Sequence, residues 1–140
     1  MENDRKDPQD SLNWITFYEE PIESEPGAGL QPERRARVTA GLQTKAELLS
    51  YLARKLDFPY YFGRNWDALA DCLHDLSWLE DVAIRLVHAD VPLKEPEEQA
   101  SYLGILRDAV ASWEENNPRR LSVLFPLACR PTVERLISID

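Results

Sequence analysis

Residues 61–73 read YFGRNWDALADCL, and they predict a glycine-containing turn followed by an amphipathic helix. Asn65 is a residue type that commonly caps a helix N-terminus. From there the apolar residues recur three and four apart, as one buried helix face requires; they are Trp66, Leu69, Ala70, Leu73 and Leu76. The stretch therefore predicts a helix over residues 65–76 with one face against the core.

The same helix carries a row of carboxylates on a second face. Asp67, Asp71 and Asp75 lie four residues apart, and residues 65–81 hold five acidic side chains and no Lys or Arg. Like charges at this spacing destabilise a helix by roughly 0.2–0.5 kcal/mol per pair. One interpretation is that the carboxylates bind a positively charged partner. The ordinary interpretation is that the helix dipole favours Asp67 and that Asp75 is a solvated helix end, although neither explains Asp71 well.

Length and composition are those of a single globular domain. The chain has 140 residues, of which 44% are hydrophobic and 29% charged. No run of 18 apolar residues predicts a membrane span, and residues 1–6 lack the pattern of a secretion signal, so we expect a cytoplasmic protein. Cys72 and Cys129 have no metal-type spacing, and we expect both to be reduced thiols.

The negative charge is unevenly distributed. The formal net charge is −9, but residues 1–33 alone hold nine acidic and two basic side chains. The remaining residues are nearly balanced, apart from local acidic segments such as residues 65–81. A segment of this kind repels a phosphate backbone, which argues against direct nucleic-acid binding, and it favours the approach of a basic protein.

Three regions are predicted along the chain. Residues 1–33 form an acidic, proline-rich N-terminal extension, in which residues 14–18 have the composition of an edge strand. Residues 34–126 form the domain, and residues 127–140 form a C-terminal tail with a short helix around Val133 and Leu136.

Within the domain, strands and helices alternate. Strands are predicted over residues 35–40, 82–87 and 121–125. A capping box from Thr44 to Glu47 begins one helix, and Pro96 occupies the first position of another. The order β-α-α-β-α-β places helical crossovers between apolar strands, which indicates parallel pairing. The predicted fold class is α/β, with a three-stranded parallel sheet packed with helices.

The motif of residues 61–73, continued by Asp75-Leu76-Ser77-Trp78, resembles the barstar-like proteins, a family of intracellular ribonuclease inhibitors. The resemblance covers residues 34–126 and implies the same β-α-α-β-α-β fold around a three-stranded parallel sheet. It implies an immunity-type protein that is not an enzyme and needs no cofactor or metal. It also implies a monomer that forms a one-to-one complex with a basic extracellular-type ribonuclease or nuclease toxin.

The resemblance also implies roles for individual residues, because in this family the turn and the second helix plug the ribonuclease active site. Tyr61 would pack against the catalytic His of the nuclease. Gly63 and Asn65 would bring the backbone close to the partner. Asp67 and Asp71 would meet the basic groups that normally hold RNA phosphate, with Asp71 entering deepest as a phosphate mimic.

This chain departs from the best-known inhibitor of the family at several positions. Ala70 stands in place of an exposed Trp, and Trp66 in place of a Leu. Two Glu residues of the third helix become Asp108 and Ser112, so one acid is shortened and one is lost. The departures predict inhibition of a different cognate nuclease. The predicted partner-binding residues are Tyr61, Gly63, Asn65, Trp66, Asp67, Ala70, Asp71 and Asp108.

Other functions and roles remain open at this stage. The first alternative is a barstar-fold adaptor or regulator that binds a different basic protein without inhibiting a nuclease. A hydrolase built on Asp67, Asp71 and His74 is a weak third hypothesis, because no catalytic motif accompanies these residues. Burial of the aspartates, or their neutralisation by an internal Arg64 or Arg107, would contradict the inhibitor hypothesis.

The aromatic and histidine residues near the motif also have two interpretations. Trp66 is equally suited to the core and to a partner interface, whereas core packing is favoured for Trp78. His74 and His88 are predicted to be ordinary surface or core residues, and Cys72 a buried thiol.

Overall fold

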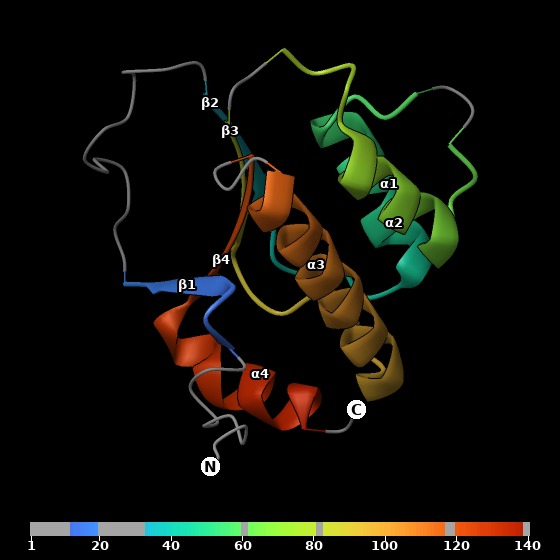
Figure 1. The fold of residues 1–140 in the computed structure, drawn as a ribbon. Helices are drawn as coiled ribbons and strands as arrows, with labels where there is room; N and C mark the ends of the chain where they lie inside the picture. Colours follow the sequence, from blue (N-terminus) through green and yellow to red (C-terminus); the bar gives the residue numbers. More distant parts are fainter. Residues whose placement is uncertain (1–11, 20–32, 60–61, 81–82, 117–119, 139–140) are drawn as a thin grey trace.

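The computed structural model describes residues 12–19, 33–59, 62–80, 83–116 and 120–138. Figure 1 shows their elements, which are β1 (Ile15–Tyr18), β2 (Glu33–Val38), α1 (Lys45–Lys55), α2 (Trp66–Asp75), β3 (Ala83–His88), α3 (Pro96–Asn116), β4 (Leu121–Pro126), the 3-10 helix η2 (Leu127–Cys129) and α4 (Arg130–Ile137). From β2 to β4, the order of strands and helices is the one predicted.

The strands form one parallel sheet in the order β1-β4-β3-β2. At its centre, Leu86 of β3 pairs with Ala36 of β2 and with Val123 of β4. The α/β class with a parallel sheet is confirmed, but the sheet has four strands rather than the three predicted. The additional strand, β1, has the edge position that its composition suggested. It pairs with β4, near the other end of the chain, so no local pattern reveals the pairing.

The helices and one face of the sheet share a single hydrophobic core. Helix α1 packs against β2, while α3 packs against α2, α4 and β4; Figure 1 shows α3 between α2 and α4. The predicted inward face of α1 is fully buried, and it consists of Leu48, Leu49, Leu52 and Leu56. Val133 and Leu136 of α4 belong to the same core cluster, so this helix packs on the domain.

Helix α1 begins with the predicted capping box. Thr44 Oγ1 accepts a hydrogen bond from the Glu47 backbone N–H at 3.1 Å, and Glu47 Oε1 accepts one from the Thr44 N–H at 3.2 Å. The backbone donors of Gln43 and Thr44 lower the pKa of the Glu47 carboxyl. The helix ends at Lys55, close to where Pro59 predicts an end.

His88 lies at the centre of the fold in a buried polar network. Its Nδ1 is 3.0 Å from the Leu124 carbonyl oxygen, and its Nε2 is 2.7 Å from the Tyr102 hydroxyl. Because a carbonyl only accepts, Nδ1 carries the proton and Tyr102 donates to Nε2. Burial lowers the pKa of His88 to about 4, so the ring is neutral at neutral pH. The prediction of an ordinary core residue is confirmed for His88.

Candidate partner-binding site

Helix α2 is fixed at its start by its own cap. Asn65 Oδ1 accepts a hydrogen bond from the Ala68 N–H at 2.7 Å, which confirms Asn65 as the N-cap. The inward face of the helix is buried and consists of Leu69, Cys72 and Leu73. Leu76 is the C-cap, in the left-handed conformation with φ 51°. The helix therefore buries the face that its periodicity predicts.

The described part of the turn before α2 contains Gly63, Arg64 and Asn65. Tyr61 lies outside the described residues, while Gly63 and Asn65 are both exposed. The left-handed residue of the turn is Arg64, with φ 58°, and not Gly63. A Cβ at Gly63 would lie 3.4 Å from the Asn65 amide nitrogen, which is an ordinary van der Waals contact. Close approach of Gly63 to a partner stays a prediction.

The carboxylates of α2 face solvent. Asp67, Asp71 and Asp75 are all exposed. Over the part of the chain that the structure describes, no Lys or Arg forms an ion pair with Asp67 or Asp71. Arg64 precedes them in the turn without pairing with them. The negative charge of α2 is therefore not compensated within the described fold.

A groove with a volume of about 340 Å³ lies between α2 and α3. Its lining residues are Trp66, Asp67 and Ala70 from α2, and Ala100, Ser101, Gly104, Ile105 and Asp108 from α3. The structure thus brings together four predicted site residues that come from two separate helices. The small side chains leave the groove open, and each helix contributes one carboxylate to it.

Asp108 is less isolated than the carboxylates of α2. Its side chain is 67% exposed, and one of its oxygens lies 3.4 Å from Arg107 Nε. An exposed pair of this kind contributes little energy and is open to exchange with a partner. Ser112, where the family resemblance places a second acid, is half-buried and cannot replace that charge.

Trp66 packs against the core, and its role at a partner interface stays a prediction. Its ring centroid lies 6.4 Å from that of buried Tyr102, and Lys45 Nζ lies 5.4 Å from its ring. The half-buried side chain also lines the groove. Trp66 therefore connects the core to the groove surface.

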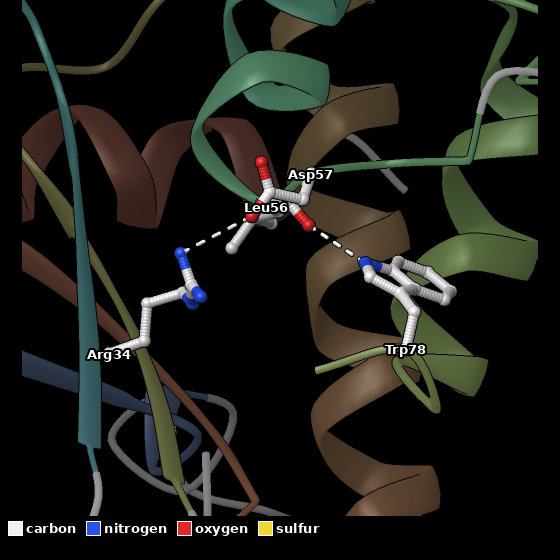
Figure 2. A network of polar contacts seen from close by, with 4 residues as sticks. All are labelled: Arg34, Leu56, Asp57 and Trp78. Carbon is white, nitrogen blue, oxygen red and sulfur yellow. Dashed lines mark hydrogen bonds and ion pairs between the residues drawn. The ribbon is translucent and has the colours of Figure 1, made fainter. Parts of the chain in front are cut away.

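Trp78, which follows α2, contacts the segment between α1 and α2 (Figure 2). Its Nε1 donates to the Leu56 carbonyl oxygen at 2.8 Å, and its ring meets Phe58 edge to face. Figure 2 also shows Arg34 directed toward Asp57, with an Nη1 to Oδ2 distance of 3.7 Å. The half-buried Trp78 thus packs against the end of α1, as the favoured interpretation predicts.

Two residues that sequence reasoning missed contact the C-terminal end of α2. Trp113 of α3 donates from Nε1 to the Leu73 carbonyl oxygen at 2.7 Å. Arg120, immediately before β4, donates from Nη2 to the carbonyl oxygens of Leu76 and Leu79, at 2.5 and 3.1 Å. Neither residue belongs to the sequence motif. The only signal in the sequence was an arginine at the start of an apolar strand.

Cys72 is the thiol on the buried face of α2. Burial, followed by the charges of Asp71 and Asp75, raises the pKa of the Cys72 thiol, which opposes thiolate formation. Within the described ranges, no group of three or more His, Cys, Asp or Glu side chains is arranged to hold a metal ion. No helix in that part of the chain is long and apolar enough to span a membrane. The exposed carboxylates of α2 instead suit recognition of a cationic group.

Comparison with known proteins agrees with this geometry. The family model described as Barstar (barnase inhibitor) matches residues 36–125, which is well over half of the chain. A search among curated proteins found no match. Barstar family members are inhibitors and not enzymes. From the length of the match, the motif and the parallel α/β fold, the chain belongs to the barstar family.

Proposed function

We propose that this protein is an immunity-type inhibitor that blocks the active site of a small basic ribonuclease with α2. Family membership supports a partner of the barnase type, because the matching model is described as a barnase inhibitor. The observation that carries the proposal is the exposure of Asp67 and Asp71 without an ion pair to any described residue.

The chemistry of a ribonuclease site suits this surface. Such a site holds RNA phosphate with Lys and Arg side chains, and a carboxylate presents an oxygen pair that Arg can bind in the same forked geometry. Helix α2 is formed and capped in the free protein, so docking it costs little conformational entropy. Its unpaired charge also accelerates the approach of a basic partner, with a strong dependence on salt.

The groove extends the contact from α2 to α3. A partner side chain that enters it meets Trp66 and the small residues Ala70 and Gly104. Asp67 and Asp108 contribute negative charge to the same groove, so a long basic side chain is the favoured occupant. Ala70 stands where the best-known relative has a larger side chain, and it helps to keep the groove open. Such a local difference in shape is consistent with a different cognate nuclease.

The test compares two aspartates of the same helix. Wild type, Asp71→Ala and Asp75→Ala are titrated against a panel of small basic ribonucleases, with cleavage of a fluorogenic RNA as the readout. Loss of a carboxylate that pairs with a buried cation costs about 3–5 kcal/mol, so Asp71→Ala should weaken inhibition at least about a hundredfold. Asp75→Ala removes the same charge from the end of α2 and should change inhibition by less than about threefold.

Two outcomes distinguish the hypotheses, and a third measurement checks the stoichiometry. Equal inhibition by wild type and Asp71→Ala would contradict the proposed mode of binding. Capture of a basic protein without nuclease activity, by affinity purification from host lysate, would instead support the adaptor alternative. Size-exclusion chromatography checks the expected stoichiometry, which is a free monomer and a one-to-one complex with the nuclease.

A further inference from the structure

The end of α2 lacks a side-chain cap of its own. The last four carbonyls of a helix have no partner within the helix. Leu76 closes α2 in a left-handed conformation, which is unfavourable for a residue with a side chain. The orphan carbonyl of Leu73 and the carbonyl of Leu76 instead accept hydrogen bonds from Trp113 and Arg120. The start of the helix is thus fixed locally, and its end depends on distant residues.

Trp113 and Arg120 act on this end together, and we call the two residues the C-terminal clamp. Arg120 is only 8% exposed, and its guanidinium lies 5.8 Å from the centroid of the Trp113 ring. Its positive charge sits at the helix end where the dipole is negative. By also binding the Leu79 carbonyl, Arg120 spans the turn that follows α2. The clamp connects this turn to α3 and to the start of β4.

We infer that the C-terminal clamp sets the rotation of α2 about its axis, so that Trp113 and Arg120 are positioning residues for inhibition. The inference rests on the proposed function of Asp67 and Asp71. Their carboxylates lie roughly 6 Å from the helix axis, so a rotation of about 10° moves them by about 1 Å. A shift of that size breaks the distance and angle requirements of a charge-assisted hydrogen bond.

The main test is a double-mutant cycle in inhibition. Trp113→Phe keeps an aromatic side chain but removes the indole N–H that donates to Leu73, and it is combined with Asp71→Ala. In the wild-type background, Trp113→Phe should weaken inhibition about tenfold. In the Asp71→Ala background, the same substitution should cost at most about twofold, because the misplaced group is already absent.

Tyr18→Phe is the matched control. It also removes one donor to a backbone carbonyl, because Tyr18 donates to the His88 carbonyl oxygen at 2.6 Å, but it lies on β1. A general loss of stability would affect inhibition in both variants, whereas positioning affects only Trp113→Phe. An equal cost of Trp113→Phe with and without Asp71, or an equal effect of Tyr18→Phe, would overturn the inference.

A second measurement needs no partner. Hydrogen exchange of the amides in the last turn of α2 should be faster in Trp113→Phe, and faster still in Arg120→Met, than in Tyr18→Phe. Unchanged exchange in both clamp variants would refute the clamp itself. If exchange responds but wild type inhibits no ribonuclease in the panel, the proposed function fails instead, and with it the role of the clamp in inhibition.

Discussion

Helix α2 and strand β2 are both rich in charge, but they use it in opposite ways. On β2, Glu33 pairs with Arg35 at 3.5 Å and with Arg85 of the neighbouring strand at 2.8 Å. Arg34 pairs with Asp57 after α1. On α2, Asp67 and Asp71 form no ion pair with any described residue. The charges of Glu33, Arg34 and Arg35 on β2 are thus paired within the described fold, while those of Asp67 and Asp71 on α2 are available to a partner.

The position of β2 in the sheet explains why it carries so many charged side chains. It is an edge strand of the sheet, and charged side chains on an edge oppose pairing with another chain. Tyr51 of α1 donates to the Arg37 carbonyl at 2.9 Å and so occupies one backbone acceptor of this strand. Glu33 and Arg85 are close but not oriented as a hydrogen bond, so their contact is an ion pair. The absence of ion pairs at Asp67 and Asp71, more than charge density, is therefore what supports the proposed binding surface on α2.

The largest effect is expected from removing the unpaired charge of α2. Asp67→Asn with Asp71→Asn should reduce inhibition by at least about 3 kcal/mol, measured as the inhibition constant. The free energy of unfolding should change by less than about 0.5 kcal/mol, because relief of the repulsion offsets the loss of a favourable dipole contact at Asp67. Urea unfolding of the same variant checks the second value, and a large destabilisation would mean that these carboxylates serve the fold.

The next largest effect is the pH dependence of stability that buried His88 causes. The pKa of His88 is lowered by burial from 6.5 to about 4, so the unfolded chain binds a proton more readily than the folded protein. Stability should be highest above pH 6.5 and fall as the pH decreases towards 4, by about 3 kcal/mol in total from this group. Urea unfolding between pH 7.5 and 5 measures the change, since most carboxylates titrate below that range.

Matched histidine variants test this assignment. His88→Gln should flatten the pH dependence of unfolding between pH 7.5 and 5, even though it lowers stability at all pH values through lost packing on Phe125. His74→Gln, at an exposed position on α2, serves as the control and should leave the dependence in place. A steep dependence that survives in His88→Gln would assign it to another group.

Local signals predicted much of this fold and part of the site. The caps at Thr44 and Asn65 and the first position of α3 at Pro96 involve residues a few positions apart, so the sequence shows them directly. The inward face of α2 follows from its periodicity in the same way. Exposure of Asp67 and Asp71 follows from that periodicity, because the two residues lie away from the apolar face.

Features that depend on distant segments were not predictable. Pairing of β1 with β4 joins the two ends of the chain, and the count of three strands failed for that reason. The groove exists only because α2 packs beside α3, so that Gly104 and Asp108 line it together with Ala70. The contact of Arg120 with Leu76 is equally remote in sequence, and a buried arginine has no periodic signature. Nonlocal packing decides all three features.

A smaller effect on stability is expected from removing the carboxylate of Glu33 on β2. Glu33→Ala removes the partner of Arg35 and Arg85, and the side chain of Glu33 is only 16% exposed. Because the arginines are more exposed than the acid, the loss should be about 1–2 kcal/mol of unfolding free energy, less than for a fully buried pair. Inhibition by the folded variant should stay within about twofold of wild type. A clear loss of inhibition would place β2 in the binding surface. It would then contradict the proposed difference in role between β2 and α2.

The smallest effects on stability are expected from Gly→Ala substitutions at two glycines, one in the groove and one outside it. Gly104 is inside α3, and a Cβ there would meet only Arg107 Nη2, at 3.8 Å. Gly104→Ala should therefore stabilise the protein by about 0.5–1 kcal/mol, since alanine favours a helix interior. Gly41, at φ 92°, has space but a conformation that alanine rarely adopts, so Gly41→Ala should destabilise by about 1 kcal/mol or more.

Inhibition assays then compare the same Gly→Ala substitution in the groove, at Gly104, and in a loop outside it, at Gly41. The added methyl of Gly104→Ala lies in the groove, so a partner side chain that fills this groove should be bound less tightly although the inhibitor is more stable. Gly41→Ala lies in the loop between β2 and α1, and should lose stability without losing affinity. Opposite changes in stability and affinity at Gly104 would show that the groove is left open for a partner. Tighter inhibition by Gly104→Ala would show that the partner leaves the groove empty, with α2 alone forming the contact.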